Sequence, residues 1–214
     1  MDETMSTVGR PARVSKLDAT QRLPPDRRIW LQPGEHRAVN GPWILSTLLG
    51  SCIAACLYDR DVDVSGMNHF LLANRRYAKS MPMNLTEAGR YGINAMELLI
   101  NDMLKLGATR AGLRAKVFGG AVFMPHEEDS VFLCVGEVNR RFIREFLTVE
   151  GIPVEADDTG GYRGRVIHFH TDNLKVFRRY IRNGQLDKEI AKEEKAAWKD
   201  SLAHVGEEGT PILF

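Results

Sequence analysis

The sequence lacks the features that would place it in a membrane, on nucleic acid or among disulfide-stabilised secreted proteins. No apolar run approaches the roughly 18 residues that a transmembrane helix needs. The 29 basic and 28 acidic side chains leave a net charge of +1, without the basic excess of a broad nucleic-acid surface. Three cysteines form no disulfide pattern, and the polar residues 1–28 hold no apolar core of a secretory signal. We therefore expect free thiols in a reducing cytoplasm.

The composition that is present indicates one globular domain with a charged segment at each end. The chain has 214 residues, 43% of them hydrophobic, and is long enough to bury a substantial core. Residues 1–28 combine prolines with many charges and show no sustained periodicity, which predicts a flexible N-terminal arm. Residues 184–214 carry many Lys and Glu around a sparse apolar stripe, which predicts a charged C-terminal helix and tail. The folded domain is expected over residues 29–183.

Hydrophobic periodicity divides this domain into short strands and two helices. The helices are expected over residues 84–106 and 139–149, each followed by a glycine. Strands are expected over residues 43–48, 52–58, 66–72, 115–123 and 131–135, followed by a hairpin of residues 165–169 and 174–181. A turn is expected at residues 157–161. Because strands and helices do not alternate regularly, the pattern predicts an α+β fold rather than a doubly wound sheet.

One cysteine–histidine pair is the best candidate for chemistry. Cys52 follows Gly50 and Ser51, where a tight turn can present a thiol, and His69 lies on a nearby apolar run. The thiolate is the nucleophilic form, so a reactive cysteine needs a neighbouring base such as histidine. Backbone N–H groups of the turn at Gly50 and Ser51 could stabilise an oxyanion.

Each of these residues also has a structural interpretation. An isolated cysteine is often a small buried hydrophobe, and an isolated histidine on an apolar strand is often a core residue. Cys56 lies at even spacing from Cys52, so we expect it on the same strand face, in the core or as a minor wall of the site. A zinc site built from Cys52, Cys56 and His69 lacks the second ligand pair of such sites, so no metal is expected.

A set of motifs, in a fixed order, resembles a known family. The motifs are Leu49-Gly50-Ser51-Cys52, Gly66-x-x-His69, Gly119-Gly120-Ala121, Gly136-x-x-Asn139 and Asp158-Thr159-Gly160-Gly161-x-x-Gly164-Arg165. Over roughly residues 31–182 they resemble the CheD family, the chemoreceptor glutamine deamidases of bacterial chemotaxis. The resemblance implies a layered α/β/β/α sandwich of mixed sheets flanked by helices, of the cysteine-hydrolase deamidase type.

The resemblance also implies an activity and partners. It implies a cytoplasmic protein-glutamine glutaminase that hydrolyses side-chain amides on methyl-accepting chemoreceptor helices and so tunes adaptation. Cys52 would be the nucleophile and His69 the base, without a cofactor, and some members bind a CheC-type phosphatase. The alternative is a docking module that binds receptor helices or the phosphatase without catalysis. The intact pair of Cys52 and His69 favours the enzyme.

The third member of the catalytic set stays open between two neighbours. The family usually has a threonine six positions before the cysteine, and here Ser46 occupies that position while Thr47 follows it. Neighbouring residues of a strand face opposite sides, so only one of these hydroxyls can orient His69. The register favours Ser46.

Overall fold

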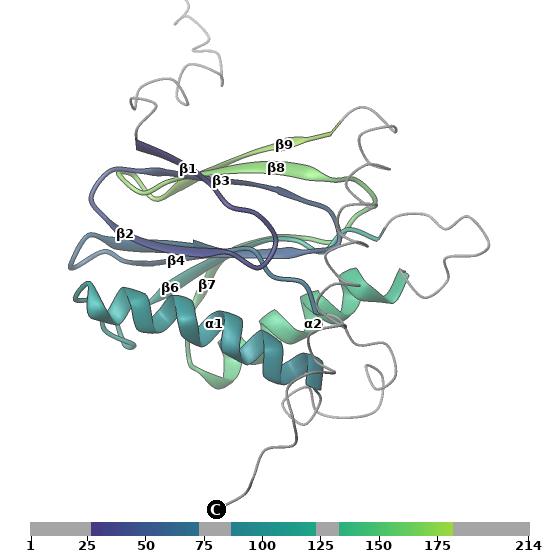
Figure 1. The fold of residues 1–214 in the computed structure, drawn as a ribbon, viewed down its shortest axis with the longest axis horizontal. Coiled ribbons are helices and arrows are strands. Elements are labelled where there is room, and N and C mark those ends of the chain that lie inside the picture. Colours follow the sequence, from purple (N-terminus) through teal and green to yellow (C-terminus); the bar gives the residue numbers. More distant parts are fainter. Residues whose placement is uncertain (1–26, 73–86, 123–132, 182–214) are drawn as a thin grey trace, which may run out of the picture.

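Two β-sheets pack face to face, and two helices lie against one of them (Figure 1). The structure, a computed structural model, describes residues 27–72, 87–122 and 133–181. The C-terminal helix and tail expected over residues 184–214 lie outside the described residues, as does nearly all of the arm expected over residues 1–28. No helix within the described ranges is long and apolar enough to cross a membrane.

The outer sheet has four strands in the order β1-β3-β8-β9. Strand β1 pairs in parallel with β3, and the β3–β8 and β8–β9 pairs are antiparallel, the latter being the hairpin expected from the sequence. The strands are β1 (Arg28–Trp30), β3 (Ile44–Leu49), β8 (Arg165–His170) and β9 (Lys175–Tyr180).

The central sheet has five strands in the order β2-β5-β4-β6-β7 and lies between the outer sheet and the helices (Figure 1). Its pairs are antiparallel except for β6 and β7, which run in parallel. The strands are β2 (His36–Asn40), β4 (Ile53–Asp59), β5 (Val64–Asn68), β6 (Arg114–Gly119) and β7 (Val154–Thr159).

Both helices cover the far face of the central sheet. Helix α1 (Glu87–Lys105) packs on β2 and β5, and α2 (Leu133–Val149) packs on β4 and β6. Each buries the apolar stripe that its sequence predicts, including Met96, Leu99 and Met103 of α1. Just beyond the C-terminal end of each helix, a glycine has a positive φ angle: Gly107 follows α1 with φ 104°, and Gly151 follows α2 with φ 66°.

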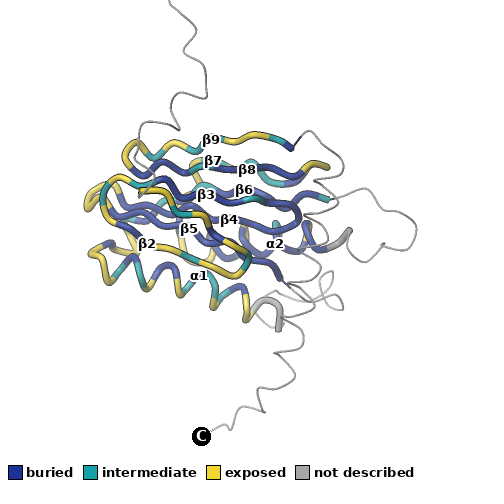
Figure 2. Tube along the Cα trace, turned by 45° about the horizontal axis from the view of Figure 1, so that its top comes forward, coloured by how far each residue is buried: buried dark blue, intermediate teal, exposed yellow. Residues whose placement is uncertain are grey.

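Strand β4 separates two hydrophobic cores and is buried at every residue (Figure 2). Ile53, Ala55 and Leu57 face the helices, whereas the alternate residues face the outer sheet. This double burial explains the continuous apolar run of the sequence. Cys52 and Cys56 belong to the core between the sheets, on one face, as their even spacing predicts.

The layered α+β fold of mixed sheets and flanking helices is confirmed, although three local expectations are wrong. The strand expected at 131–135 is wrong where the structure describes it, because Leu133 begins α2, and a short apolar run does not distinguish a strand from a buried helix start. The turn expected at 157–161 is wrong over residues 157–159, which belong to β7. His69 follows the end of β5 rather than lying within it.

Candidate active site

Cys52 lies in the turn that joins β3 to β4, and its side chain is 0% exposed. Three consecutive carbonyls of this turn accept hydrogen bonds from elements behind it. Gly50 O accepts from Ala121 N at 2.8 Å, Ser51 O from Asn139 Nδ2 at 2.8 Å, and Cys52 O from Gly120 N at 2.7 Å. These bonds fix the orientation of the peptide planes around the thiol.

Glycines at two positions let the supporting elements come this close. Gly119 has φ 109°, and a Cβ atom built on it would lie 2.1 Å from Cys52 O. A Cβ atom on Gly136 of α2 would lie 2.4 Å from Ala121 O. Any larger residue would push the support away from the Cys52 turn, which explains two of the glycine motifs physically.

Asn139 of α2 connects the Cys52 turn to the segment that carries His69. It is fully buried, its Nδ2 donates to Ser51 O at 2.8 Å, and its Oδ1 accepts from Leu72 N at 2.9 Å. The motif Gly136-x-x-Asn139 contains this residue, but the motif alone predicts no role for it. An asparagine on the apolar face of a helix was the available signal, since buried amides are almost always hydrogen-bonded.

The segments of Cys52 and His69 pair directly with each other. Ile53 and Phe70 form an antiparallel bridge, with N–O distances of 3.0 Å and 2.9 Å. In that register Cys52 lies opposite Leu71, and His69 is its diagonal neighbour on the face toward the outer sheet. The bridge therefore brings the two predicted residues together.

A turn of the preceding chain holds the backbone of His69. His69 N donates to Glu35 O at 2.9 Å, and His69 O accepts from Gly34 N at 2.7 Å. Gly34 has φ 87°, a conformation that suits glycine in the turn between β1 and β2. The backbone of His69, a residue that is 2% exposed, is consequently held through both its N–H and its carbonyl group.

Thr47 orients the imidazole. Its Oγ1 lies 2.8 Å from His69 Nδ1 and donates to Leu31 O at 2.8 Å. The carbonyl can only accept, so it takes the one hydroxyl hydrogen and Nδ1 must carry the hydrogen of the second bond. Nε2 then holds the lone pair, and it has no hydrogen-bond partner among the described residues.

Burial keeps this imidazole neutral. Desolvation lowers the pKa of His69 to about 4, and the hydrogen bond with the Leu31 backbone opposes the shift only in part. At neutral pH the ring is therefore uncharged, with Nε2 available to accept a proton.

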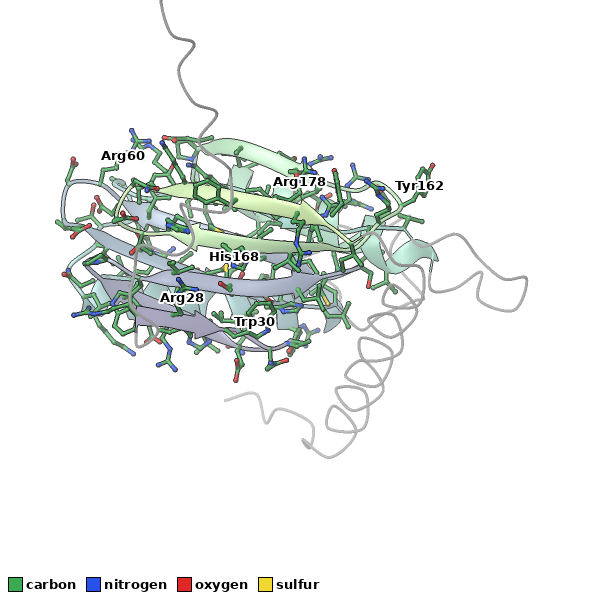
Figure 3. The ribbon with its side chains drawn as sticks, turned by 90° about the horizontal axis from the view of Figure 1, so that it is seen from above. Arg28, Trp30, Arg60, Tyr162, His168 and Arg178 are labelled. Carbon is green, nitrogen blue, oxygen red and sulfur yellow. The ribbon has the colours of Figure 1, made fainter. Side chains whose placement is uncertain are left out.

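The preference for Ser46 as the partner of His69 is wrong. Ser46 Oγ lies 2.8 Å from His168 Nδ1, on the opposite face of the outer sheet, where Arg28 and Trp30 also lie (Figure 3). The inward face of β3 holds Leu45, Thr47 and Leu49. A count of six positions back from Cys52 leads to Ser46. The alternation of inward and outward side chains along β3 does not continue through the turn that carries Cys52, so this count does not show which of Ser46 and Thr47 faces inward.

The motif that ends in Arg165 supports the site from behind. The buried Arg165 guanidinium donates to the backbone carbonyls of Asp158 and Gly160, and to Asp158 Oδ1 at 3.1 Å. Gly160 N in turn donates to Gly119 O at 2.8 Å, next to the Cys52 turn. This loop therefore has a structural role behind the Cys52 turn.

Cys56 differs from Cys52 in its surroundings. It lies within β4, and burial raises the pKa of its thiol well above the usual range, with Lys116 opposing the shift in part. Such a thiol is inert as a nucleophile. Within residues 27–72, 87–122 and 133–181 no three His, Cys, Asp or Glu side chains are grouped as a metal site would require.

Comparisons with known proteins agree on one family. The family model described as CheD chemotactic sensory transduction matches residues 71–180. A relative from Geobacter sulfurreducens, named probable chemoreceptor glutamine deamidase CheD 1, is 52% identical over 85% of this chain and 90% of its own. The probable chemoreceptor glutamine deamidase CheD 2 of Shewanella oneidensis is 40% identical over 87% of this chain and 93% of its own.

Solved structures overlap the chain only in part. The Bacillus licheniformis hypothetical protein YfiH covers 57% of this chain and 49% of its own, with a TM-score of 0.33 and 17% identity. An overlap of that size supports no assignment of function.

Proposed function

The chain belongs to the CheD family, and on that premise we propose that it is a cytoplasmic protein-glutamine glutaminase acting on bacterial chemoreceptors. It hydrolyses the side-chain amides of specific glutamines on the receptors' cytoplasmic helices to glutamate and ammonia, which tunes adaptation in chemotaxis. One observation carries the proposal: an imidazole held on Thr47 through Nδ1 is the diagonal neighbour of Cys52. The names of the relatives point to the same activity.

The first half of the reaction forms a thioester. His69 Nε2 takes the proton of the Cys52 thiol, and the sulfur attacks the carbonyl carbon of the glutamine side chain, so that the carbonyl electron pair moves to oxygen. His69 then gives its proton to the amide nitrogen as the carbon–nitrogen bond breaks. Ammonia leaves, and the acyl group stays on the sulfur.

The second half regenerates the enzyme. His69 Nε2 accepts a proton from water while the oxygen of that water attacks the thioester carbon. The second tetrahedral intermediate collapses, the carbon–sulfur bond breaks, and the thiolate recovers the proton from His69. The product is glutamate, and no oxidant, metal or cofactor enters the balance.

The turn of Gly50 and Ser51 serves as the oxyanion site in this mechanism. In a trans peptide the N–H of a residue points opposite to the preceding carbonyl. The Gly50 and Ser51 carbonyls point to Ala121 and Asn139, so the N–H groups of Ser51 and Cys52 point away from that support. Losing one such donor typically costs about 2.7–4 kcal/mol of transition-state stabilisation.

The decisive experiment follows single glutamines by mass spectrometry. The purified full chain is incubated with a chemoreceptor cytoplasmic fragment, beside the Cys52→Ala variant and the matched control Cys56→Ala. Wild type and Cys56→Ala are expected to convert glutamine to glutamate, and Cys52→Ala to bind the fragment without converting it. Full conversion by Cys52→Ala would refute the assignment of Cys52 as the nucleophile.

A parallel arm separates catalysis from docking. If wild type binds the receptor fragment but converts no glutamine, the chain is a docking module rather than an enzyme. A CheC-type phosphatase, added to both arms, tests the remaining proposed partner: a stable complex and a changed conversion rate are expected.

A further inference from the structure

Tyr91 lies in the first part of α1 and reaches the turn that holds His69. The residue is 40% exposed, so part of its ring meets solvent. Its hydroxyl lies 3.9 Å from the position that a Cβ atom on Gly34 would take. Gly34 N is the donor to His69 O, so the phenol lies against the backbone that fixes the base.

A close helix approach brings Tyr91 to this place. A Cβ atom on the next residue, Gly92, would lie 2.5 Å from Phe142 Cζ and 2.8 Å from Leu72 Cδ2. The glycine lets this part of α1 lie directly on Leu72, which follows His69 closely in the chain and is held by Asn139. The position of Tyr91 is therefore set by the same contacts that build the site.

The Tyr91 hydroxyl also lies within electrostatic range of Cys52. Burial raises the pKa of Tyr91, and the negative charge of the Cys52 thiolate raises it further. The phenol consequently stays protonated and can donate its hydrogen at the moment when charge develops next to the sulfur.

We propose that Tyr91 is a substrate-binding residue whose hydroxyl donates a hydrogen bond to the oxygen of the glutamine side-chain carbonyl under attack by Cys52. The exposed part of its ring forms a wall beside the aliphatic part of that side chain. The assignment rests on the proposed glutaminase activity. It adds a side-chain donor to the backbone N–H groups of the Cys52 turn, and the bond strengthens as the carbonyl oxygen becomes an oxyanion.

The test compares Tyr91→Phe, which removes only the hydroxyl, with Tyr91→Ala, which also removes the ring. Tyr162→Phe is the matched control, since Tyr162 is 68% exposed, on the loop between β7 and β8. Tyr91→Phe should lower kcat on the receptor fragment roughly 10- to 100-fold and leave KM within about threefold, because the lost bond forms mainly in the transition state. Tyr91→Ala should in addition raise KM. Equal kcat for Tyr91→Phe and wild type would overturn the assignment.

A second readout needs no receptor. Iodoacetamide alkylation of Cys52, followed by peptide mapping across pH, reports the thiolate fraction of the free enzyme. A hydroxyl that points to the reaction centre also stabilises the thiolate through its dipole, so the midpoint of alkylation should rise in Tyr91→Phe and stay unchanged in Tyr162→Phe. If wild type converts no receptor glutamine, the proposed function fails, and the alkylation midpoint alone then tests Tyr91. A raised midpoint supports a Tyr91 hydroxyl that points to the reaction centre, and an unchanged midpoint refutes it.

Discussion

Thr47 Oγ1 lies 2.8 Å from His69 Nδ1, and the same oxygen donates to Leu31 O. This relay fixes the tautomer of the imidazole as a carboxylate does in other hydrolases, but it places no negative charge beside the ring. The pKa of His69 accordingly remains at about 4, where burial puts it. In the proposed mechanism, the imidazolium must therefore be stabilised by the Cys52 thiolate and the charged intermediate rather than by Thr47.

Thr47→Val should lower kcat roughly 10- to 100-fold, because it removes the hydroxyl at His69 Nδ1 and leaves a buried N–H without that acceptor. Ser46→Ala is the matched control, since its hydroxyl bonds His168 on the other face of the sheet. Its rate should stay within about twofold of wild type. Glutamine conversion by both variants, measured at equal folded fraction, checks the assignment, and equal losses would contradict it.

Gly119→Ala should abolish conversion, because its Cβ atom would lie 2.1 Å from Cys52 O and the turn that carries the thiol must move. Gly107→Ala separates this effect from backbone strain. Gly107 has a similar φ of 104°, yet nothing lies within 4 Å of its Cβ position. Both variants should lose roughly 1–2 kcal/mol of stability to backbone strain, Gly119→Ala should lose more because of the clash, and only Gly119→Ala should lose activity. An active Gly119→Ala enzyme would show that the turn tolerates displacement.

Asn139→Asp should lower the free energy of unfolding by about 1–3 kcal/mol, because the buried Ser51 carbonyl loses its donor and faces a carboxylate instead. Activity of the folded fraction should also fall. Asn173→Asp is the control: Asn173 is exposed, and its Oδ1 accepts from Lys175 N, which aspartate can still do. Urea denaturation of both variants measures the difference. Equal stability of the two would refute the bridging role.

Burial and chain order made much of this molecule predictable from the sequence. The continuous apolar run of β4 reflects its two covered faces, and the order of the motifs selected Cys52 and His69 as candidates, which the pairing of Ile53 with Phe70 makes neighbours. Three strands escaped prediction, and all of them are edges: β1 is an edge of the outer sheet, and β2 and β7 are the two edges of the central sheet. Edge strands bury little and carry polar residues, so they show no hydrophobic period.

The parts of the site that were missed depend on tertiary contacts. The choice between Ser46 and Thr47 is a matter of one step in strand register, which the sequence around the turn does not determine. Asn139 acts across the long sequence separation between α2 and the Cys52 turn, so no local pattern could show what it binds.

His69 should make the stability of the protein depend on pH below neutrality. In the unfolded chain the imidazole titrates near its ordinary pKa of 6.5, whereas the buried ring titrates at about 4. Above the unfolded value both states are neutral and the contribution to stability is complete. As the pH falls below 6.5, the unfolded chain binds a proton at His69 that the native state does not bind. The free energy of unfolding therefore declines until the pH reaches the pKa of the folded state, about 4.

His69→Asn isolates this contribution, because the asparagine amide can still donate to Thr47 but does not titrate. Between about pH 7.5 and about pH 5, wild type should lose about 2 kcal/mol more unfolding free energy than the variant. His168 and His170, whose pKa values are also lowered by burial, are present in both proteins and cancel in the comparison. Urea titrations at a series of pH values give the two curves. Parallel curves would mean that the folded protein protonates His69 as readily as the unfolded chain does, which would refute the lowered pKa that burial of the ring implies.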